Sequence, residues 1–219
     1  MPTQATENYL KALYSLHLKN PEISLTELGQ RLGVSKPTVN EMIKRLEKEG
    51  WVMYERYKPI SLTEEGKKMA ALVIRKHRLS EMFLSDIMGF GWEEVHQIAE
   101  QIEHLKSDIF FDRMDEMLGF PTSDPHGSPI PDREGNMIKN NYKTLSQIKE
   151  GETVELKALR SSDKEFLMYL NKKEISLGVE IKVNNIEVFD NSFTVSYGEQ
   201  VNVVLSQAVA AKLLVEVIK

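Results

Sequence analysis

The sequence of 219 residues contains no cysteine, which excludes disulfide bonds, thiolate metal ligands and cysteine nucleophiles. It also lacks any apolar run that approaches the roughly 18 residues of a membrane-spanning helix. The first residues have neither the basic nor the apolar stretch of a secretory signal, so we expect a cytoplasmic protein with no membrane partner. With 41% hydrophobic and 28% charged residues, the chain is able to bury a globular core.

The charge of the chain changes sign along its length, although the net charge of the whole is only −5. Residues 1–79 hold 14 basic and 9 acidic side chains, whereas residues 80–140 hold 4 basic and 13 acidic ones. Residues 141–219 are nearly balanced, with 10 basic and 11 acidic side chains. A polyanion such as DNA therefore suits the first segment, and cations suit the second.

The basic segment has the pattern of a winged helix-turn-helix. The apolar spacing predicts three helices, over residues 7–18, 25–32 and 36–49. Ser24 and Ser35 are typical N-caps of the second and third helices. Two short β-rich segments, 51–56 and 60–62, joined by a turn at 57–59, predict the wing.

The rest of the chain predicts two long helices, a linker and a β domain. The helices are expected over 63–88 and 92–118, and their excess of apolar side chains favours a homodimer. We therefore expect a mainly α protein with β structure, divided into four parts. These are a winged-helix DNA-binding domain at 1–74, a helical metal-binding and dimerisation domain at 75–119, a proline-rich linker at 120–142 and a small β-barrel at 143–219.

Histidine and glutamate recur at helical spacing in the acidic segment. One face of each predicted long helix would carry His77 and Glu81, and His96, Glu100, Glu103 and His104, respectively. Imidazole and carboxylate ligands suit borderline to hard divalent ions. A single histidine or glutamate on a helix most often lies on a solvated surface. Here, however, these residues form one stripe along each helix, and histidine is scarce, with five in the chain, so a metal site is favoured.

Two other classes of function stay open from the residues alone. Carboxylate and histidine ligands at helical spacing also build hydrolase or oxidase sites with two metals, but neither Glu81 nor Glu100 has a histidine three residues later. A winged-helix regulator that senses an organic ligand would leave the stripe as plain surface. Since the sequence has no Ser-His-Asp arrangement, phosphate-binding glycine loop or dinucleotide motif, we expect a protein that is not an enzyme.

The order of these motifs resembles the diphtheria toxin repressor family of metal-dependent transcriptional regulators. The resemblance rests on RKHRL at 75–79, on His-x3-Glu-x2-Glu-His at 96–104 and on Asp-Pro-His-Gly at 124–127, after a winged helix. It implies a repressor that binds a pseudo-palindromic operator as a dimer when metal is bound, and that controls genes of metal-ion uptake. It also implies that the C-terminal barrel is FeoA-like, of the Src-homology type.

The resemblance implies two metal sites. The first would use Asn8, Glu100, Glu103 and His104, with Glu7 as a substitute for the uncharged Asn8; the second would use His77, Glu81 and His96, with Asp124, His126 and Asp163 as further candidates. A carboxylate at position 100 is typical of manganese-responding members, so we expect Mn²⁺, with Fe²⁺ next and Zn²⁺ or other divalent ions as substitutes in vitro. Asn8 departs from both the Asp of manganese-responding members and the Met of iron-responding ones. A loop turn and a surface acid remain equal alternatives for the three further candidates.

The resemblance places base contacts at Ser35, Pro37 and Thr38, in the first turn of the predicted recognition helix. Ser35 and Pro37 also suit the start of a helix without any DNA. Phosphate contacts, which position a protein without reading sequence, are expected from Arg31, Lys36, Lys44, Lys48, Arg56 and Lys58.

Overall fold

The structure is a computed structural model, and it describes residues 2–56, 58–138 and 140–218. The chain folds into two compact units. Unit 1 comprises Met1–Ser80, Gln97–Thr122 and Ile130–Ile138, and unit 2 comprises Glu81–His96, Ser123–Pro129 and Lys139–Lys219. The division into four parts stays a prediction, and Tyr57 of the predicted wing turn lies outside the described residues.

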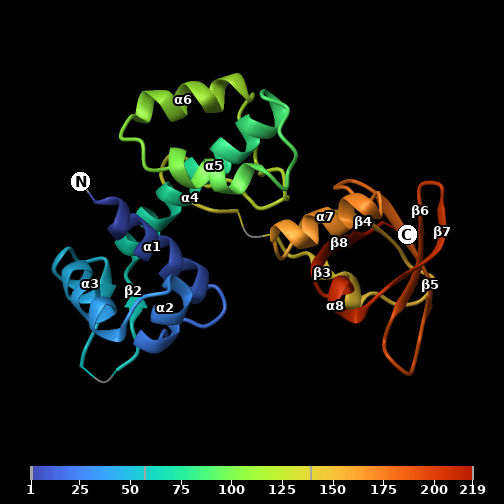
Figure 1. Ribbon diagram of the computed structural model, residues 1–219, viewed down its shortest axis with the longest axis horizontal. Coiled ribbons are helices and arrows are strands. Elements are labelled where there is room, and N and C mark those ends of the chain that lie inside the picture. Colours follow the sequence, from blue (N-terminus) through green and yellow to red (C-terminus); the bar gives the residue numbers. More distant parts are fainter. Residues whose placement is uncertain (1, 57, 139, 219) are drawn as a thin grey trace. The chain divides into compact units, whose positions relative to one another are not determined.

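Unit 1 begins with the predicted winged helix-turn-helix (Figure 1). Its elements are α1 (Gln4–His17), α2 (Leu25–Leu32), α3 (Lys36–Lys48), β1 (Val52–Met53) and β2 (Ser61–Leu62). Ser24 and Ser35 cap α2 and α3 because each hydroxyl accepts a hydrogen bond from the backbone N–H three residues later. Gly33 ends α2 with a φ of 66°, a left-handed conformation that glycine adopts without strain.

An apolar core holds these three helices and the wing together. Leu10 of α1, Leu28 of α2 and Ile43 of α3 are fully buried in it. The backbones of Ile23 and Ile60 exchange two hydrogen bonds of 3.1 and 2.8 Å, which tie the wing to the loop before α2. Burial of each such side chain contributes about 1.5–3 kcal/mol to the free energy of folding. These side chains hold the apolar face of α3 in the core, so its opposite face lies in solvent.

The long helix predicted at 63–88 is confirmed, but the one predicted at 92–118 is wrong. The structure has α4 (Glu64–Asp86), α5 (Val95–Ile102) and α6 (Asp108–Met117). The chain turns at Glu103 and His104, which bond to side chains of α1, and the Leu105 carbonyl accepts a bond of 3.4 Å from Lys76. Hydrogen bonds between charged groups are stronger than the neutral backbone bonds that a continuous helix would add.

A buried ion pair joins α4 to α6 within unit 1. The Arg75 guanidinium lies 2.6 Å from Asp115 and donates a second hydrogen bond of 2.8 Å to the Pro131 carbonyl. The two side chains are only 10% and 7% exposed. Arg75 therefore fixes two helices and the segment 130–138 at one point.

Unit 2 contains a six-stranded antiparallel sheet in the order β3-β8-β4-β5-β6-β7 (Figure 1). Its strands are β3 (Lys143–Thr144), β4 (Thr153–Leu159), β5 (Glu180–Ile186), β6 (Phe193–Tyr197), β7 (Gln200–Leu205) and β8 (Leu213–Val217). A 3₁₀ turn (η1, Leu145–Gln147) and the helices α7 (Lys164–Lys172) and α8 (Gln207–Ala210) complete the unit. Phe166, Leu167 and Leu170 of α7 share one apolar core with the sheet.

The sequence pattern does not predict β8, and it extends β5 too far. In β8 only Leu213 and Val215 are buried, which is too short an alternation to distinguish a strand from a loop. The alternating apolar pattern over 179–189 predicts one strand, but β5 ends at Ile186. Beyond it, Val188 and Phe189 are 91% and 95% exposed, so their apolar character has no role in the core.

The mainly helical fold with a C-terminal β domain is as predicted. Within the described residues, no helix combines the length and apolar character needed to cross a membrane.

We expect Asp115→Ala to lower the free energy of unfolding by about 3–5 kcal/mol, because the buried Arg75 loses its ion partner. Chemical denaturation measures the difference. Glu116→Ala is the matched control, since Glu116 lies 2.7 Å from Arg113 but the two side chains are 46% and 74% exposed, and exposed pairs contribute only about 0–1 kcal/mol. Equal losses in the two variants would contradict the importance of the buried pair.

Candidate metal centres and nucleic-acid interface

The buried carboxylate of Glu103 is the centre of a first cluster, in unit 1. Its side chain has no exposed surface. The Nζ atom of Lys11 lies 2.9 and 2.7 Å from its two oxygens, and Nδ1 of His77 lies 2.5 Å from Oε2. A carboxylate removed from water is stable only with such partners.

These partners keep Glu103 charged. Burial alone would raise the pKa of the Glu103 carboxyl, but the hydrogen bond with His77 and the positive charge of Lys11 outweigh burial and hold this pKa below its ordinary value of 4.5. At neutral pH the group is therefore ionised, as a carboxylate must be to bind a metal ion.

Glu7 of α1 holds His104 in one orientation. Nδ1 of His104 lies 2.6 Å from Glu7, and Nε2 lies 3.5 Å from Oε1 of Glu103. A carboxylate only accepts hydrogen bonds, so the bond to Glu7 keeps the ring proton on Nδ1. Histidine ligands of metals commonly have such a partner, because it directs the other ring nitrogen. In the neutral ring, the lone pair of His104 is therefore on Nε2, the nitrogen that faces Glu103.

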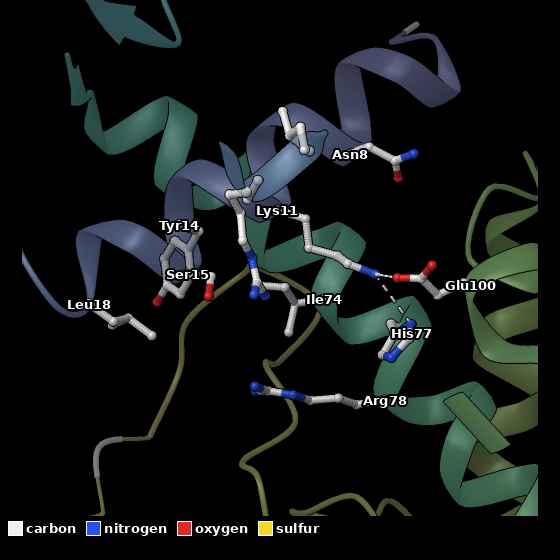
Figure 2. A pocket seen from close by; sticks show the side chains of 12 residues that line it. Asn8, Lys11, Tyr14, Ser15, Leu18, Ile74, His77, Arg78 and Glu100 are labelled. Atoms are coloured by element: carbon white, nitrogen blue, oxygen red, sulfur yellow. Dashed lines mark hydrogen bonds and ion pairs between the residues drawn. The ribbon is translucent and has the colours of Figure 1, made fainter. Parts of the chain in front are cut away.

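The other residues predicted for the first site line a pocket of about 360 Å³ (Figure 2). Asn8 is an exposed wall residue, and the Glu100 side chain is 52% exposed and 3.2 Å from Lys11. The ligand atoms of the predicted first site do not lie close together. Among the described residues, no group of three histidine or carboxylate ligand atoms within 4.8 Å of one another includes Glu100, Glu103 or His104.

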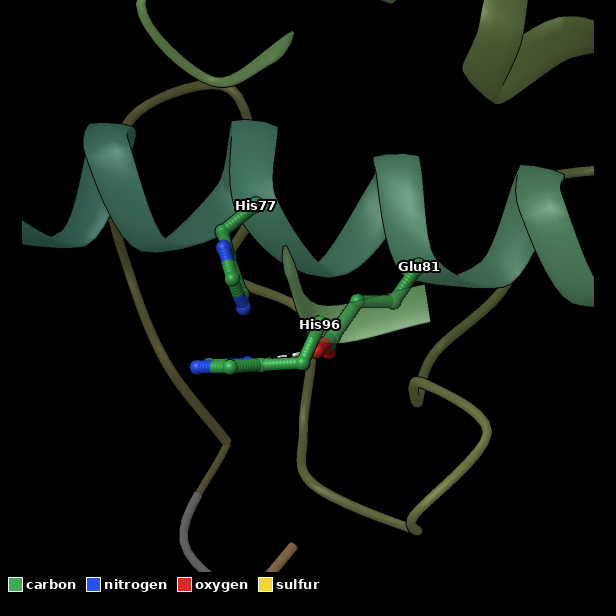
Figure 3. A group of neighbouring side chains, drawn as sticks. All are labelled: His77, Glu81 and His96. Atoms are coloured by element: carbon green, nitrogen blue, oxygen red, sulfur yellow. Dashed lines mark hydrogen bonds and ion pairs between the residues drawn. The ribbon is translucent and has the colours of Figure 1, made fainter. Parts of the chain in front are cut away.

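Glu81 is the centre of a second cluster, in unit 2. Nδ1 of His96 lies 3.1 Å from Oε1 of Glu81 (Figure 3). Nδ1 of His126 lies 3.8 Å from Oε2 of Glu81 and 4.0 Å from Asp124. Glu81, Asp124 and His126 are all buried and offer ligand atoms within 4.8 Å of one another. His77 precedes Glu81 by one turn of α4, so both leave the same face of this helix (Figure 3).

The ring of His126 is oriented by Trp92. Nε2 of His126 lies 2.8 Å from the Trp92 carbonyl, which only accepts, so Nε2 carries the proton. The two rings also stack, with centroids 6.1 Å apart. In the neutral form the lone pair of His126 is on Nδ1, the atom that faces Glu81 and Asp124.

The loop that carries His126 is held against β4 by a glycine. Gly127 has a φ of 82°, and a Cβ atom there would lie 2.2 Å from the Lys157 carbonyl oxygen. Only glycine permits this approach. The Leu159 N–H donates a 2.9 Å bond to the His126 carbonyl, and Asp124 accepts from two backbone N–H groups of its own loop. The loop is therefore a defined part of the site.

Asp163, a further predicted ligand, lies elsewhere on unit 2. It is the N-cap residue of α7, its side chain is 73% exposed, and it lies 3.6 Å from Lys212. Within the described residues, it belongs to no closely spaced group of ligand atoms. Its role as a ligand stays a prediction.

The single stripe predicted from His96 to His104 is wrong as a helical face. His96 and Glu100 lie in α5, whereas Glu103 and His104 lie in the turn that follows. His96 bonds to Glu81, while Glu103 and His104 bond to α1, so the residues are divided between the two clusters. The spacing of histidine and glutamate does not single out Lys11, although its place one turn after Glu7 puts both on one face of α1.

All nine residues predicted to contact DNA have exposed side chains: Arg31, Ser35, Lys36, Pro37, Thr38, Lys44, Lys48, Arg56 and Lys58. Some already have partners within the chain. The Ser35 and Thr38 hydroxyls lie 2.8 Å apart, and Lys58 lies 2.6 Å from Glu55. Their contacts with DNA stay predictions.

The exposed face of α3 lies opposite its buried residues, Val39, Ile43 and Leu46. Lys44 and Lys48 stand on it at a spacing of four residues. The same face carries Glu41 and Arg45, both exposed, which are not among the residues predicted to contact DNA. A simple helical projection from the three buried positions would have found both.

Three parts of the chain match described families. Residues 1–60 match the N-terminal DNA binding domain of iron dependent repressors, residues 63–132 match the metal binding and dimerisation domain of these repressors, and residues 143–217 match the FeoA domain.

Two curated relatives show how far the similarity extends. The iron-dependent repressor IdeR of Mycobacterium tuberculosis is 38% identical over 126 residues, which cover 58% of this chain and 55% of that protein. The chain thus aligns with just over half the length of this relative. The diphtheria toxin repressor of Corynebacterium efficiens is 32% identical over 190 residues, 82% of this chain and 83% of that protein.

Solved structures cover nearly the whole chain. A manganese-dependent transcriptional repressor in complex with manganese has a TM-score of 0.87 and 31% identity, over 97% of this chain and 100% of that one. ScaR with bound Zn²⁺ has a TM-score of 0.79 and 33% identity, over 99% and 100%.

We expect His126 of the chelator-treated protein to titrate above the ordinary histidine pKa of 6.5. Burial alone would lower the pKa of His126, but the negative charges of the nearby Glu81 and Asp124 carboxylates and the hydrogen bond to the Trp92 carbonyl outweigh burial. Because the folded pKa is the higher one, this stabilisation is complete below about pH 6.5 and is lost as pH rises through the raised value.

An NMR titration of the His126 ring measures this pKa. Glu81→Gln should lower it, whereas Glu180→Gln, at an exposed position of β5, should leave it unchanged. A wild-type value at or below 6.5 would contradict the expectation.

Proposed function

Because the chain belongs to the diphtheria toxin repressor family of metal-dependent transcriptional regulators, we propose that it is a repressor that binds a pseudo-palindromic operator as a homodimer when a divalent ion is bound. One observation carries this proposal. Side chains of α1, in the part that matches a DNA binding domain, bond to Glu103 and His104, in the part that matches a metal binding domain. The regulated genes are those of metal-ion uptake.

We assign the first ion to Asn8, Glu100, Glu103 and His104. These residues offer amide and carboxylate oxygens and one imidazole nitrogen, and no sulfur, which suits Mn²⁺ first and Fe²⁺ second, with Zn²⁺ as a substitute in vitro. The buried charge of Glu103 and the directed nitrogen of His104 fit a cation. Glu7 orients His104, so the ligand that α1 supplies is the uncharged Asn8, and the site binds its ion more weakly than an aspartate there would.

The arrangement works as a clamp on the DNA-binding helices. When bound, the ion supplies a positive charge that ligands from separate segments share. Asn8 and Glu7 lie on α1, whose buried face packs with α2 and α3, whereas Glu103 and His104 follow α5. Ligands from both places fix α1, and with it α3. A dimer whose recognition helices are held in place avoids the ordering cost that loose ones have on binding DNA.

The second cluster is assigned to a second ion. Glu81, Asp124 and His126 supply buried ligand atoms within 4.8 Å of one another, and His96 bonds to Glu81. An ion there would tie the end of α4 to the loop 123–129 and, through Gly127, to β4. The resemblance implies His77 as a ligand of this site, with Asp163 as a further candidate.

The homodimer is assigned to apolar side chains that α6 and its flanks leave in solvent. Leu105, Ile109, Phe110, Met117 and Phe120 are between 43% and 79% exposed. A monomer rarely leaves so many large apolar side chains exposed on one short stretch. The match of this region to a metal binding and dimerisation domain supports its use as the contact between two copies.

A hydrolase or oxidase with two metals is the weaker alternative. An enzyme of this kind would belong to a different family from the relatives, which are named as repressors. We therefore propose that the bound ions have a regulatory role and that the protein is not an enzyme.

We expect His104→Ala to abolish Mn²⁺-dependent operator binding while the fold and the dimer are kept. The assay is fluorescence anisotropy with DNA from the upstream region of its own gene, for chelator-stripped protein titrated with Mn²⁺ at fixed salt. Gln101→Ala, at an exposed position of the same segment where the side chain bonds to the Gln97 carbonyl at 3.4 Å, should behave as wild type. Normal Mn²⁺-stimulated binding by His104→Ala would refute the assignment of the first site.

Lys44→Ala should weaken binding to operator and non-operator DNA alike. Loss of one phosphate contact should lower the slope of log affinity against log salt by about 0.9. Lys172→Ala, at an exposed position of α7, should leave the slope unchanged. If both variants kept the wild-type slope, Lys44 would not contact phosphate.

A further inference from the structure

Trp92 ties the turn before α5 to a helix of the β domain in unit 2. Its side chain packs against the apolar core that α7 shares with the six-stranded sheet. The indole Nε1–H donates a hydrogen bond of 2.7 Å to Oδ1 of Asn171, near the end of α7. The two residues are 79 positions apart, so no local sequence pattern predicts this contact.

The side-chain amide of Asn171 suits both of its partners. Its Oδ1 accepts from Trp92, and its Nδ2 donates a hydrogen bond of 3.1 Å to Oε2 of Glu93. An indole only donates and a carboxylate only accepts, so a group with one acceptor and one donor side matches the pair. Asn171 is exposed and belongs to no core, so these two bonds hold the turn at residues 92 and 93.

The turn that Asn171 holds reaches the second cluster through Trp92. The Trp92 carbonyl accepts the 2.8 Å bond from Nε2 of His126, and the two rings stack with an angle of 21° between their planes. Nδ1 of His126 faces Glu81 and Asp124. A shift of Trp92 would therefore move both the acceptor and the flat surface that define the orientation of the His126 ring.

We propose that Asn171 is a positioning residue for the second ion: by holding the Trp92 indole, it keeps Nδ1 of His126 directed at Glu81 and Asp124. This inference rests on the proposed function, because it concerns the ion assigned to that cluster. A ring that is already held loses little freedom on binding a metal, and residues that support a histidine ligand commonly change metal affinity about 10–100-fold. The affinity of the second cluster thus depends on a residue of α7 that is not itself a ligand.

The test measures Mn²⁺ binding by the chelator-stripped chain with His104→Ala, which removes the first ion. The EPR signal of free Mn²⁺ during a titration gives the dissociation constant of the ion that remains. Asn171→Leu keeps a side chain of similar shape that neither accepts nor donates. We expect it to weaken binding of this ion about 10-fold. Lys172→Ala, at the next exposed position of α7, should leave the constant unchanged.

A double-mutant cycle separates positioning from a general loss of structure. Trp92→Phe removes the indole N–H but keeps an aromatic ring and a carbonyl beside His126, and it should also weaken Mn²⁺ binding. Adding Asn171→Leu to Trp92→Phe should change the constant by less than about twofold, because the bond between the two side chains is already absent. Circular dichroism checks the fold of each variant. Trp92→Phe tests the inference even if Asn171→Leu fails to fold.

The outcomes separate this inference from the assignment of the second ion. An unchanged Mn²⁺ dissociation constant in folded Asn171→Leu or folded Trp92→Phe would overturn the role of Asn171 and leave the second ion standing. Losses that multiply in the double variant would do the same, since the two residues would then act independently. If the chain with His104→Ala bound no Mn²⁺ at all, the assignment of the second ion would fail, and this inference with it.

Discussion

A carboxylate shut off from water needs positive charge beside it, and unit 1 is organised around one such group. Glu103 is fully buried and takes its partners from α1 and α4, through Lys11 and His77, while His104 beside it bonds to Glu7 of α1. Segments about 90 residues apart in sequence are thereby held at one point. Because the buried face of α1 belongs to the core of α2 and α3, the charge balance at Glu103 acts directly on the helices that we assign to DNA.

Both clusters prepare a histidine in the same way. In each, one ring nitrogen is held by an acceptor, Glu7 for His104 and the Trp92 carbonyl for His126, and the other is left on the side of a buried carboxylate. Histidine rings fixed in this way lose little conformational freedom when they bind a metal ion. The supports differ in kind, since one is a charged side chain of a helix and the other a backbone group.

The sequence predicted what depends on local signals. The caps at Ser24 and Ser35 and the turn at Gly33 determine the winged helix within a few residues, and the histidine spacing selected most of the cluster residues. It could not predict how those residues are divided. The end of α5 before Glu103 depends on contacts with α1, and no pattern around residue 103 contains that information. Lys11 was missed for the same reason, because its role comes from groups distant in sequence.

The central claim is that ion binding and DNA binding act on each other through α1. Thermodynamic linkage requires that operator DNA tighten Mn²⁺ binding by the same factor by which Mn²⁺ tightens operator binding. The most direct test measures the Mn²⁺ dissociation constant of the chain alone and of its operator complex by titration calorimetry at constant salt. A tighter constant in the complex, by the factor found for DNA, is the predicted result. Equal constants would contradict the claim.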